Sequence, residues 1–151
     1  MPEKPTGVPQ QVLPPEDLPK PTVEVRSRSY RRRKCPHCRR GCYRDKQGYR
    51  RLRDLGNPRT ERPHVIEVFY SRHRCESCGI YFSADMSDLA PPGSHYTHRV
   101  ISRAVRAVIE DGMPYRTASW HLWRDYRVFV PFATIQNWVE GTGEKKERSA
   151  R

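Results

Sequence analysis

Four of the five cysteines in this sequence have a spacing that is typical of metal binding. Cys35 and Cys38 form one C-x-x-C pair, and Cys75 and Cys78 form a second. In a C-x-x-C turn two thiolates can bind one ion while backbone N–H groups donate to the sulfurs, and Gly79 eases the sharp turn after the second pair. Two such turns complete a tetrahedral shell of four sulfurs. The sequence therefore predicts one structural Zn²⁺ ion, with no position open for an activated water.

Cys42 is left over, and three histidines could compete for the metal. They are His37, His64 and His73. With both pairs intact, we expect Cys42 to be a small half-buried residue or a free thiol, and a Cys38-x-x-x-Cys42 arrangement is the alternative. Nucleophilic use of Cys42 would need a partner base and a pocket, and the sequence indicates neither. We therefore expect no catalytic residues.

Positive charge is concentrated around the cysteine pairs. The chain has 29 Lys and Arg against 17 Asp and Glu, a formal net charge of +12, and 23 of the basic residues are arginines. Residues 31–78 alone hold 15 basic and five acidic residues, interleaved with tyrosine and phenylalanine. This balance favours a polyanion partner, most often nucleic acid. The alternative is a solvated basic surface that binds nothing.

Composition indicates that part of the chain does not fold alone. Its 151 residues allow one compact domain or two very small ones, and 35% of them are hydrophobic. Seven of the 14 prolines fall within the first 21 residues. We therefore predict a disordered proline-rich arm over residues 1–30 and a flexible tail over residues 142–151.

A small β unit is expected after the arm, and a helical unit is expected between it and the tail. Residues 49–55 and 65–72 resemble two strands of an antiparallel hairpin, with residues 80–82 as a third strand. Together with the cysteines they predict a zinc ribbon over residues 31–90. The sequence Ala90-Pro-Pro-Gly93 then marks a boundary.

A helical pattern follows over residues 94–141. Ile101, Val105, Val108 and Ile109 share one helical face, with Thr97 as N-cap and Gly112 as stop. Further helices are predicted over about 115–125, with Ala118 and Leu122 inward, and over about 131–140, with Ile135, Trp138 and Val139 inward. The predicted fold class is thus α+β, a small zinc-ribbon β unit followed by a three-helix helix-turn-helix domain. A three-helix bundle with an unrelated role is the alternative.

The third helix of a helix-turn-helix enters the major groove, where side chains from its N-terminal half contact base edges. We therefore predict base contacts from Thr134, Gln136 and Asn137, because a carboxamide can pair with the adenine edge. Phosphate contacts are predicted from nine arginines in the ribbon and the helices. These are Arg39, Arg40, Arg51, Arg53, Arg72, Arg74, Arg116, Arg124 and Arg127.

The order of these motifs resembles the N-terminal region of a bacterial insertion-sequence transposase family. The resemblance covers roughly residues 33–141, and an arginine pair follows Cys38 where the family often has glycine. The motifs that carry it are Cys35-Pro-x-Cys38, Arg53-Asp54-Leu55, Arg72-His-Arg-Cys75-x-x-Cys78-Gly79-x-x-Phe82, Leu89-Ala90-Pro91, Asp111-Gly112 and Thr134-Ile135-x-x-Trp138. The resemblance implies a zinc finger, a helix-turn-helix and then a catalytic domain with three metal-binding carboxylates, which we expect this chain to lack.

The resemblance implies a sequence-specific DNA-binding module that recognises terminal inverted repeats and does no chemistry alone. Its expected partners are double-stranded DNA and either a catalytic transposase subunit or a second copy in a homodimer. The alternatives are a stand-alone regulator or adaptor that binds DNA or RNA and a protein, and a transposase subunit whose catalytic domain is supplied in trans. Because the N-terminus lacks an apolar signal segment and no apolar run could span a bilayer, we expect a cytoplasmic protein. The resemblance further implies a bacterial protein that is associated with the nucleoid.

Overall fold

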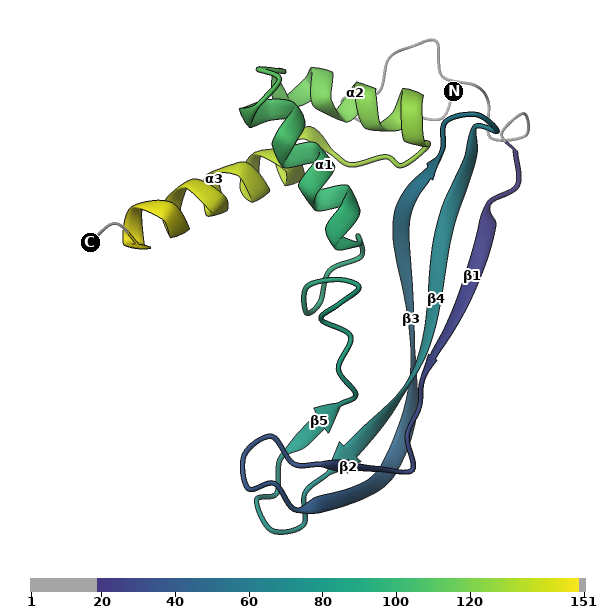
Figure 1. The fold of residues 1–151 in the computed structure, drawn as a ribbon, viewed down its shortest axis with the longest axis vertical. Helices are drawn as coiled ribbons and strands as arrows, with labels where there is room; N and C mark the ends of the chain where they lie inside the picture. The colour runs from purple at the N-terminus through teal and green to yellow at the C-terminus, as the bar shows by residue number, and fades with distance from the viewer. Residues whose placement is uncertain (1–18, 150–151) are drawn as a thin grey trace, which may run out of the picture.

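The protein consists of a long sheet with a group of three helices at one end (Figure 1). The computed structural model describes residues 19–149, with side chains up to residue 141. The elements follow in the order β1 (Thr22–Arg28), β2 (Arg32–Lys34), β3 (Gly41–Asn57), β4 (Arg62–Arg74), β5 (Tyr81–Ser83), α1 (His98–Ile109), α2 (Tyr115–Tyr126) and α3 (Phe132–Ser149). The predicted α+β class is confirmed at this level.

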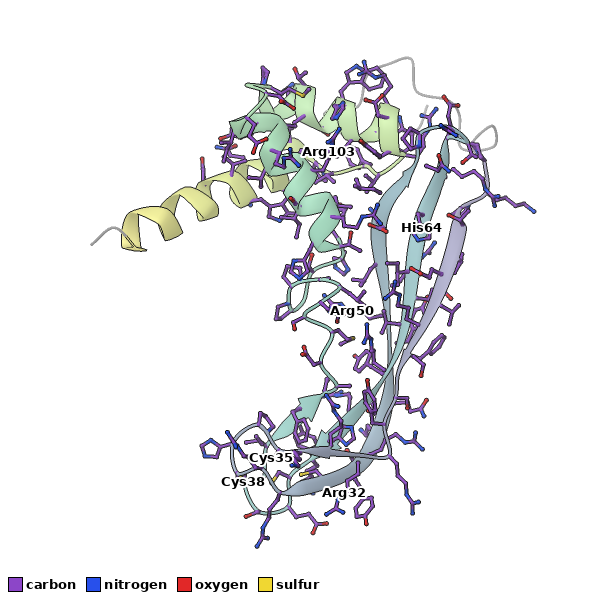
Figure 2. The ribbon with its side chains drawn as sticks, in the orientation of Figure 1. Arg32, Cys35, Cys38, Arg50, His64 and Arg103 are labelled. Carbon is purple, nitrogen blue, oxygen red and sulfur yellow. The ribbon has the colours of Figure 1, made fainter. Side chains whose placement is uncertain are left out.

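The centre of the sheet is the predicted antiparallel hairpin, which is longer than expected. β3 pairs with β4 from Arg44 opposite His73 to Asn57 opposite Arg62. The strand order is β1-β4-β3-β2, and β5 pairs with β4 as the predicted third strand. The hairpin turn lies beside the helices, whereas both cysteine pairs lie at the opposite end (Figures 1 and 2).

The prediction of a disordered arm is wrong for residues 22–28. These residues form β1, which runs parallel to β4 from Thr22 opposite His64 to Arg28 opposite Tyr70. Val23 and Val25 alternate with Glu24 and Arg26 in the period of two expected of a strand. The prolines before it dominated the sequence pattern and obscured this signal. Residues 1–18 of the predicted arm lie outside the described residues.

One face of the sheet carries a small apolar core. Leu52 on β3 packs with Ile66 and Val68 on β4, and the segment returning from β5 to α1 covers them with Leu89 and Ala90. Arg50 fixes this segment, because its Nη2 donates to the carbonyl oxygens of Pro91 and Ser94, both at 2.6 Å. The segment 90–93, which was predicted to separate the β unit from the helices, thus lies against the sheet.

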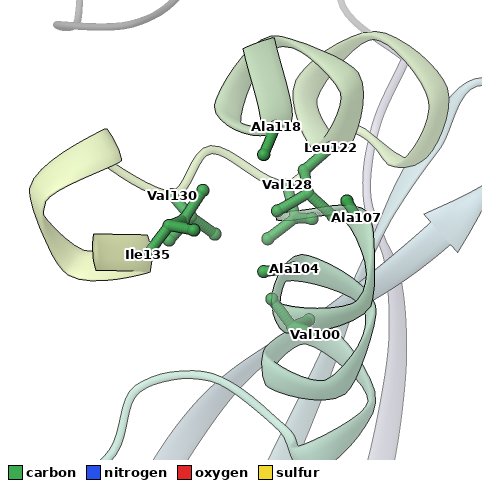
Figure 3. Close-up of a cluster of buried hydrophobic side chains, with 8 residues drawn as sticks. All are labelled: Val100, Ala104, Ala107, Ala118, Leu122, Val128, Val130 and Ile135. Atoms are coloured by element: carbon green, nitrogen blue, oxygen red, sulfur yellow. The ribbon is translucent and has the colours of Figure 1, made fainter. Parts of the chain in front are cut away.

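The three helices share a second core of eight buried side chains (Figure 3). These are Val100, Ala104, Ala107, Ala118, Leu122, Val128, Val130 and Ile135. Thr97 caps α1 as predicted, since its side chain accepts a hydrogen bond from the Val100 N–H. The predicted inner face of α1 is partly wrong, however: Val108 packs against this core, but Ile109 is 51% exposed, and Val100 and Ala104 are fully buried instead. Small alanines bring the helix backbones close together, which turns the larger residues outward.

An extended segment joins α2 to α3. α2 ends at Arg127, which has a left-handed φ of 51°, and the chain then buries Val128 and Val130 before α3 begins. The Ser119 Oγ donates to the Val130 carbonyl oxygen at 2.6 Å. The connection is therefore packed into the core, and the structure establishes three helices without confirming a helix-turn-helix.

α3 is longer than predicted. It continues to Ser149 and projects away from the rest of the molecule (Figure 1), so the expected end near residue 140 and the flexible tail over 142–151 are wrong for residues 141–149. The Glu-Lys-Lys-Glu-Arg sequence that follows Gly143 favours helix and offsets the two glycines before it. Among the helices of the described part of the chain, none combines the length and hydropathy needed to span a membrane.

The hairpin turn and the helices are joined by packing and hydrogen bonds. Leu55 packs against the helical core. The Arg53 N–H donates to the His95 carbonyl oxygen at 2.8 Å, and the Thr97 N–H donates back to the Arg53 carbonyl oxygen at 3.1 Å. The buried Asp54 accepts from the Thr97 hydroxyl at 2.7 Å. The two predicted units are thus in direct contact.

Candidate metal centre and basic surface

The four predicted metal ligands lie together at the end of the sheet far from the helices (Figure 2). The Sγ atoms of Cys35, Cys38, Cys75 and Cys78 all lie within 4.8 Å of one another. A tetrahedral Zn²⁺ ion with Zn–S bonds of about 2.3 Å places its sulfurs about 3.8 Å apart. The four thiols are therefore close enough to hold a metal ion, and each belongs to a turn that ends or begins a strand.

The two C-x-x-C turns have matching backbone hydrogen bonds. Cys35 N donates to Arg40 O at 2.8 Å, and Cys75 N donates to Ile80 O at 2.9 Å. Each turn also has one residue with positive φ, Gly79 at 72° and Arg39 at 62°. The first turn thus adopts the conformation of the second without glycine. An arginine in this left-handed region costs about 1–2 kcal/mol, which the surrounding contacts must offset.

Backbone amides stabilise thiolate at the buried ligands. The Cys78 N–H donates to the Cys75 sulfur at 3.3 Å, and the His37 N–H donates to the Cys35 sulfur at 3.4 Å. The Cys78 hydrogen bond lowers the pKa of Cys75 to about 6. The hydrogen bond with Cys38 raises the pKa of Cys78 to about 12, because adjacent sulfurs share a proton when no cation separates their charges. A metal ion would allow all four to be thiolates.

Cys42 packs beside Cys35 and Cys75 but is not one of the four cysteines whose sulfurs could together hold a metal ion. It is 5% exposed, its thiol donates to the Arg40 carbonyl oxygen at 3.3 Å, and burial raises its pKa. The expectation of a small packed thiol is confirmed, with deeper burial than predicted.

The histidines also have other partners. His73 is fully buried, shares hydrogen bonds with the Cys42 carbonyl oxygen and the Ser71 hydroxyl, and stacks on Phe82 at 5.3 Å. His64 lies near the hairpin turn beside Thr22 (Figure 2). His37 is exposed and contributes its backbone N–H to the Cys35 sulfur.

Seven of the nine arginines predicted to contact phosphate are exposed and form no ion pair with any described carboxylate. They are Arg39, Arg40, Arg51, Arg53, Arg72, Arg74 and Arg116. Arg74 lies over the Tyr81 ring at 5.7 Å, and Arg116 lies over Phe132 at 4.6 Å. Six of the seven lie on the hairpin or directly after the first C-x-x-C pair, so most of these unpaired arginines belong to the sheet and its cysteine end.

The other two arginines have intramolecular partners. Arg124 pairs with Asp125 at 3.1 Å and stacks on Trp120. Arg127 is the residue with left-handed φ, its side chain is 10% exposed, and it pairs with Glu61 at 3.5 Å. The structure thus gives Arg127 a role in joining α2 to the hairpin turn, in place of the predicted phosphate contact.

The predicted base-contacting residues lie in the first half of α3. Asn137 is exposed, whereas Thr134 and Gln136 are partly buried. The Gln136 Nε2 donates to Glu140 at 2.9 Å, so its carboxamide already has a partner on the same helix. Ile135 is fully buried, and Trp138 and Val139 pack against the helical core, as predicted.

Sequence reasoning missed the exposed face of the sheet. Val23, Val25, Tyr49 and Phe69 are between 41% and 62% exposed. The register places Tyr49 opposite Phe69 and Arg51 opposite Glu67 on the same face. The available signal was the spacing of Tyr49, Arg51 and Arg53, which a strand places on one face, but the contribution of β1 to this face was hidden by its assignment to the arm.

Comparisons with protein-family models, with curated proteins and with solved structures found no match for this chain. Its function is therefore inferred from its own residues and their geometry.

Proposed function

We propose that this protein is a DNA-binding module in which a structural Zn²⁺ ion, held by four cysteines, supports a basic sheet. The observation that carries the proposal is the set of seven exposed arginines without carboxylate partners. Unpaired arginines repel one another, and a phosphate backbone relieves this repulsion while it releases condensed counterions. By contrast, the partly buried Arg28 and the exposed Arg106 are paired internally with Asp88 and Glu110.

Zinc is the metal proposed because of the donor set. Four thiolates favour Zn²⁺ over the oxygen-binding cations, and a closed shell of four protein ligands suits a structural ion. The apolar cluster at the cysteine end of the sheet consists of Cys35, Cys42 and Cys75 with Phe82 and Cys78 beside them, which is too little apolar surface to hold the two turns together. In this proposal the ion fixes the turn that carries Arg39 and the end of β4 that carries Arg72 and Arg74.

The helical unit is proposed to supply sequence preference. α3 projects from the molecule (Figure 1). Asn137 on this helix is exposed to solvent, and the α2 residue Arg116 lies over the ring of Phe132, the first residue of α3. An exposed carboxamide on a helix can pair with the adenine edge in the major groove. We propose Asn137 as the principal base contact, with Thr134 and Gln136 as further contacts. Gln136 would first give up its hydrogen bond to Glu140 and then form one with a base.

The resemblance to the transposase family makes terminal inverted repeats the proposed targets. A selection of duplexes from a random pool tests this, because a module of this kind enriches one site whereas a purely electrostatic binder enriches none. Enrichment of no site would contradict the specific part of the proposal and leave a non-specific duplex binder.

The salt dependence of duplex affinity tests the electrostatic part. Changing both Arg72 and Arg74 to Ala should flatten the slope of log affinity against log salt by about 2, since each phosphate contact contributes about 0.9. Changing Arg106 to Ala is the matched control, because this arginine is exposed but paired with Glu110. A flat slope for the unaltered protein would refute DNA binding through these arginines and favour a protein-contacting adaptor.

A further inference from the structure

The exposed face of the sheet has a composition that differs from an ordinary solvated surface. We define the open face as Val23, Val25, Tyr49, Arg51, Arg53, Glu67 and Phe69. The register arranges these residues in three rows, in which Ser27, Phe69 and Tyr49 form one, Val25, Glu67 and Arg51 the next, and Val23, Val65 and Arg53 the third. Aromatic and basic residues thus follow one another along β3.

The aromatic row offers exposed ring surface. The rings of Tyr49 and Phe69 lie 5.2 Å apart at 53°, and the residues are 51% and 41% exposed. The Tyr49 hydroxyl donates to Glu67 at 3.0 Å, which fixes the orientation of the ring. Held in this way, the pair offers a preformed surface on which a planar group could stack.

The basic rows lie beside the aromatic pair. Residues that share a face on one strand are about 6.7 Å apart, so Arg51 and Arg53 follow Tyr49 at steps comparable to the nucleotide repeat of an extended single strand. Two clefts of about 210 and 370 Å³ both include Arg51, Arg53 and Val65 in their linings, where the sheet meets the helical unit. Positive charge and concave surface therefore continue from the aromatic pair toward the helices.

The exposed rings and arginines of the open face favour an unpaired DNA strand over a duplex or a second copy of the chain. In a duplex the faces of the bases are stacked on their neighbours and cannot reach Tyr49 or Phe69, whereas an unpaired base has a free face. A second copy of the chain would bring its own Arg51 and Arg53 against a face that already has two arginines and one glutamate. Charge complementarity thus favours a polyanion with exposed bases.

We propose that the open face binds unpaired DNA next to a duplex, with bases stacked on Tyr49 and Phe69 and phosphates held by Arg51 and Arg53. The proposal rests on the proposed DNA-binding function and extends it to the form of the DNA. Stacking of this kind tolerates any base, so this face would add affinity without sequence preference.

The test compares two probes with the full chain loaded with zinc. One is a blunt duplex, and the other is the same duplex with a four-nucleotide unpaired extension that contains 2-aminopurine. The unaltered protein should bind the extended probe about tenfold more tightly, and stacking should quench the 2-aminopurine fluorescence. Changing Phe69 or Tyr49 to Ala should bring the affinity ratio of the two probes close to one.

Conservative variants separate stacking from general apolar contact. Phe69→Tyr should keep the ratio because the ring remains, whereas Phe69→Leu should lose it although the side chain stays apolar. Ile109→Ala is the matched control, because Ile109 is an exposed apolar residue on α1, 51% exposed, away from the open face.

The outcomes distinguish this proposal from the function on which it rests. Tight binding of both probes with a ratio of one would overturn the open-face proposal and leave duplex binding intact. Binding of single-stranded oligothymidylate that is lost in Tyr49→Ala, without any duplex binding, would support the open face and refute the duplex module. A dimer in sedimentation that dissociates on Phe69→Ala would show that a second copy covers the face, and would overturn the proposal.

Discussion

Replacing Cys75 by Ser should remove most of the affinity for zinc. Cys75 is 1% exposed and its Sγ lies 3.4 Å from that of Cys38 within the four-cysteine cluster. Structural zinc binding contributes about 10–16 kcal/mol in small domains, so an equal share for each of four thiolates is about 2.5–4 kcal/mol. The expected loss of affinity is therefore about 70-fold to about 900-fold.

Cys42→Ser is the matched control. Cys42 is 5% exposed in the same small core, but its thiol donates to a carbonyl oxygen and lies outside the ligand set. A serine hydroxyl can make the same hydrogen bond, so this variant should keep the zinc affinity of the unaltered protein.

Metal analysis and competition with a zinc chelator measure both variants. The unaltered protein and Cys42→Ser should each contain about one zinc per chain, and Cys75→Ser should release zinc to the chelator and lose the near-ultraviolet circular dichroism of Tyr43 and Tyr81 near the site. Full zinc retention by Cys75→Ser, or loss of zinc by Cys42→Ser, would refute the assignment of ligands.

Four further predictions concern stability and chemistry. Zinc affinity should fall as the pH is lowered, because protons compete with the ion for the four thiolates, and chelator competition against pH measures this. Gly56→Ala should destabilise the protein by about 2–3 kcal/mol in denaturant unfolding, because the new Cβ would lie 2.5 Å from the Tyr126 carbonyl oxygen, whereas Gly141→Ala has open space and should not destabilise it. Ile135→Ala should cost about 2–4 kcal/mol by the same measurement, because its side chain is fully buried among the helices, and an unchanged midpoint would contradict the described core. The purified chain should not cleave inverted-repeat DNA with Mg²⁺ or Mn²⁺, because the four cysteines form the one potential metal-binding group found among the described residues and carboxylates are needed to hold catalytic metals.

Local patterns were sufficient to predict several features because their physical causes are local. The C-x-x-C spacing brings two sulfurs together within one turn, and the two turns meet because the strands between them form a hairpin. The alternation over residues 49–55 and 65–72 predicted that hairpin, and Thr97 predicted the start of α1 through a hydrogen bond to a residue three positions away.

Tertiary structure decided the features that depend on partners distant in sequence. β1 became a strand because β4 offered it a free edge, although the prolines before it suggested disorder. α1 buried Val100 and Ala104, and exposed Ile109, because close helix packing requires small side chains at the contact. Arg127, expected at phosphate, was placed against Glu61 by the left-handed end of α2.

The open face also depends partly on local sequence and partly on tertiary structure. The sequence alone determined that Tyr49, Arg51 and Arg53 share one face of β3, because a strand places every second residue on one side. Only the pairing register placed Phe69 beside Tyr49, and Glu67 beside Arg51, since these contacts join residues 16–20 positions apart. Composition and short-range spacing therefore determined which chemical groups this protein has, whereas the packing of strands and helices decided which of them meet and which remain exposed to a partner.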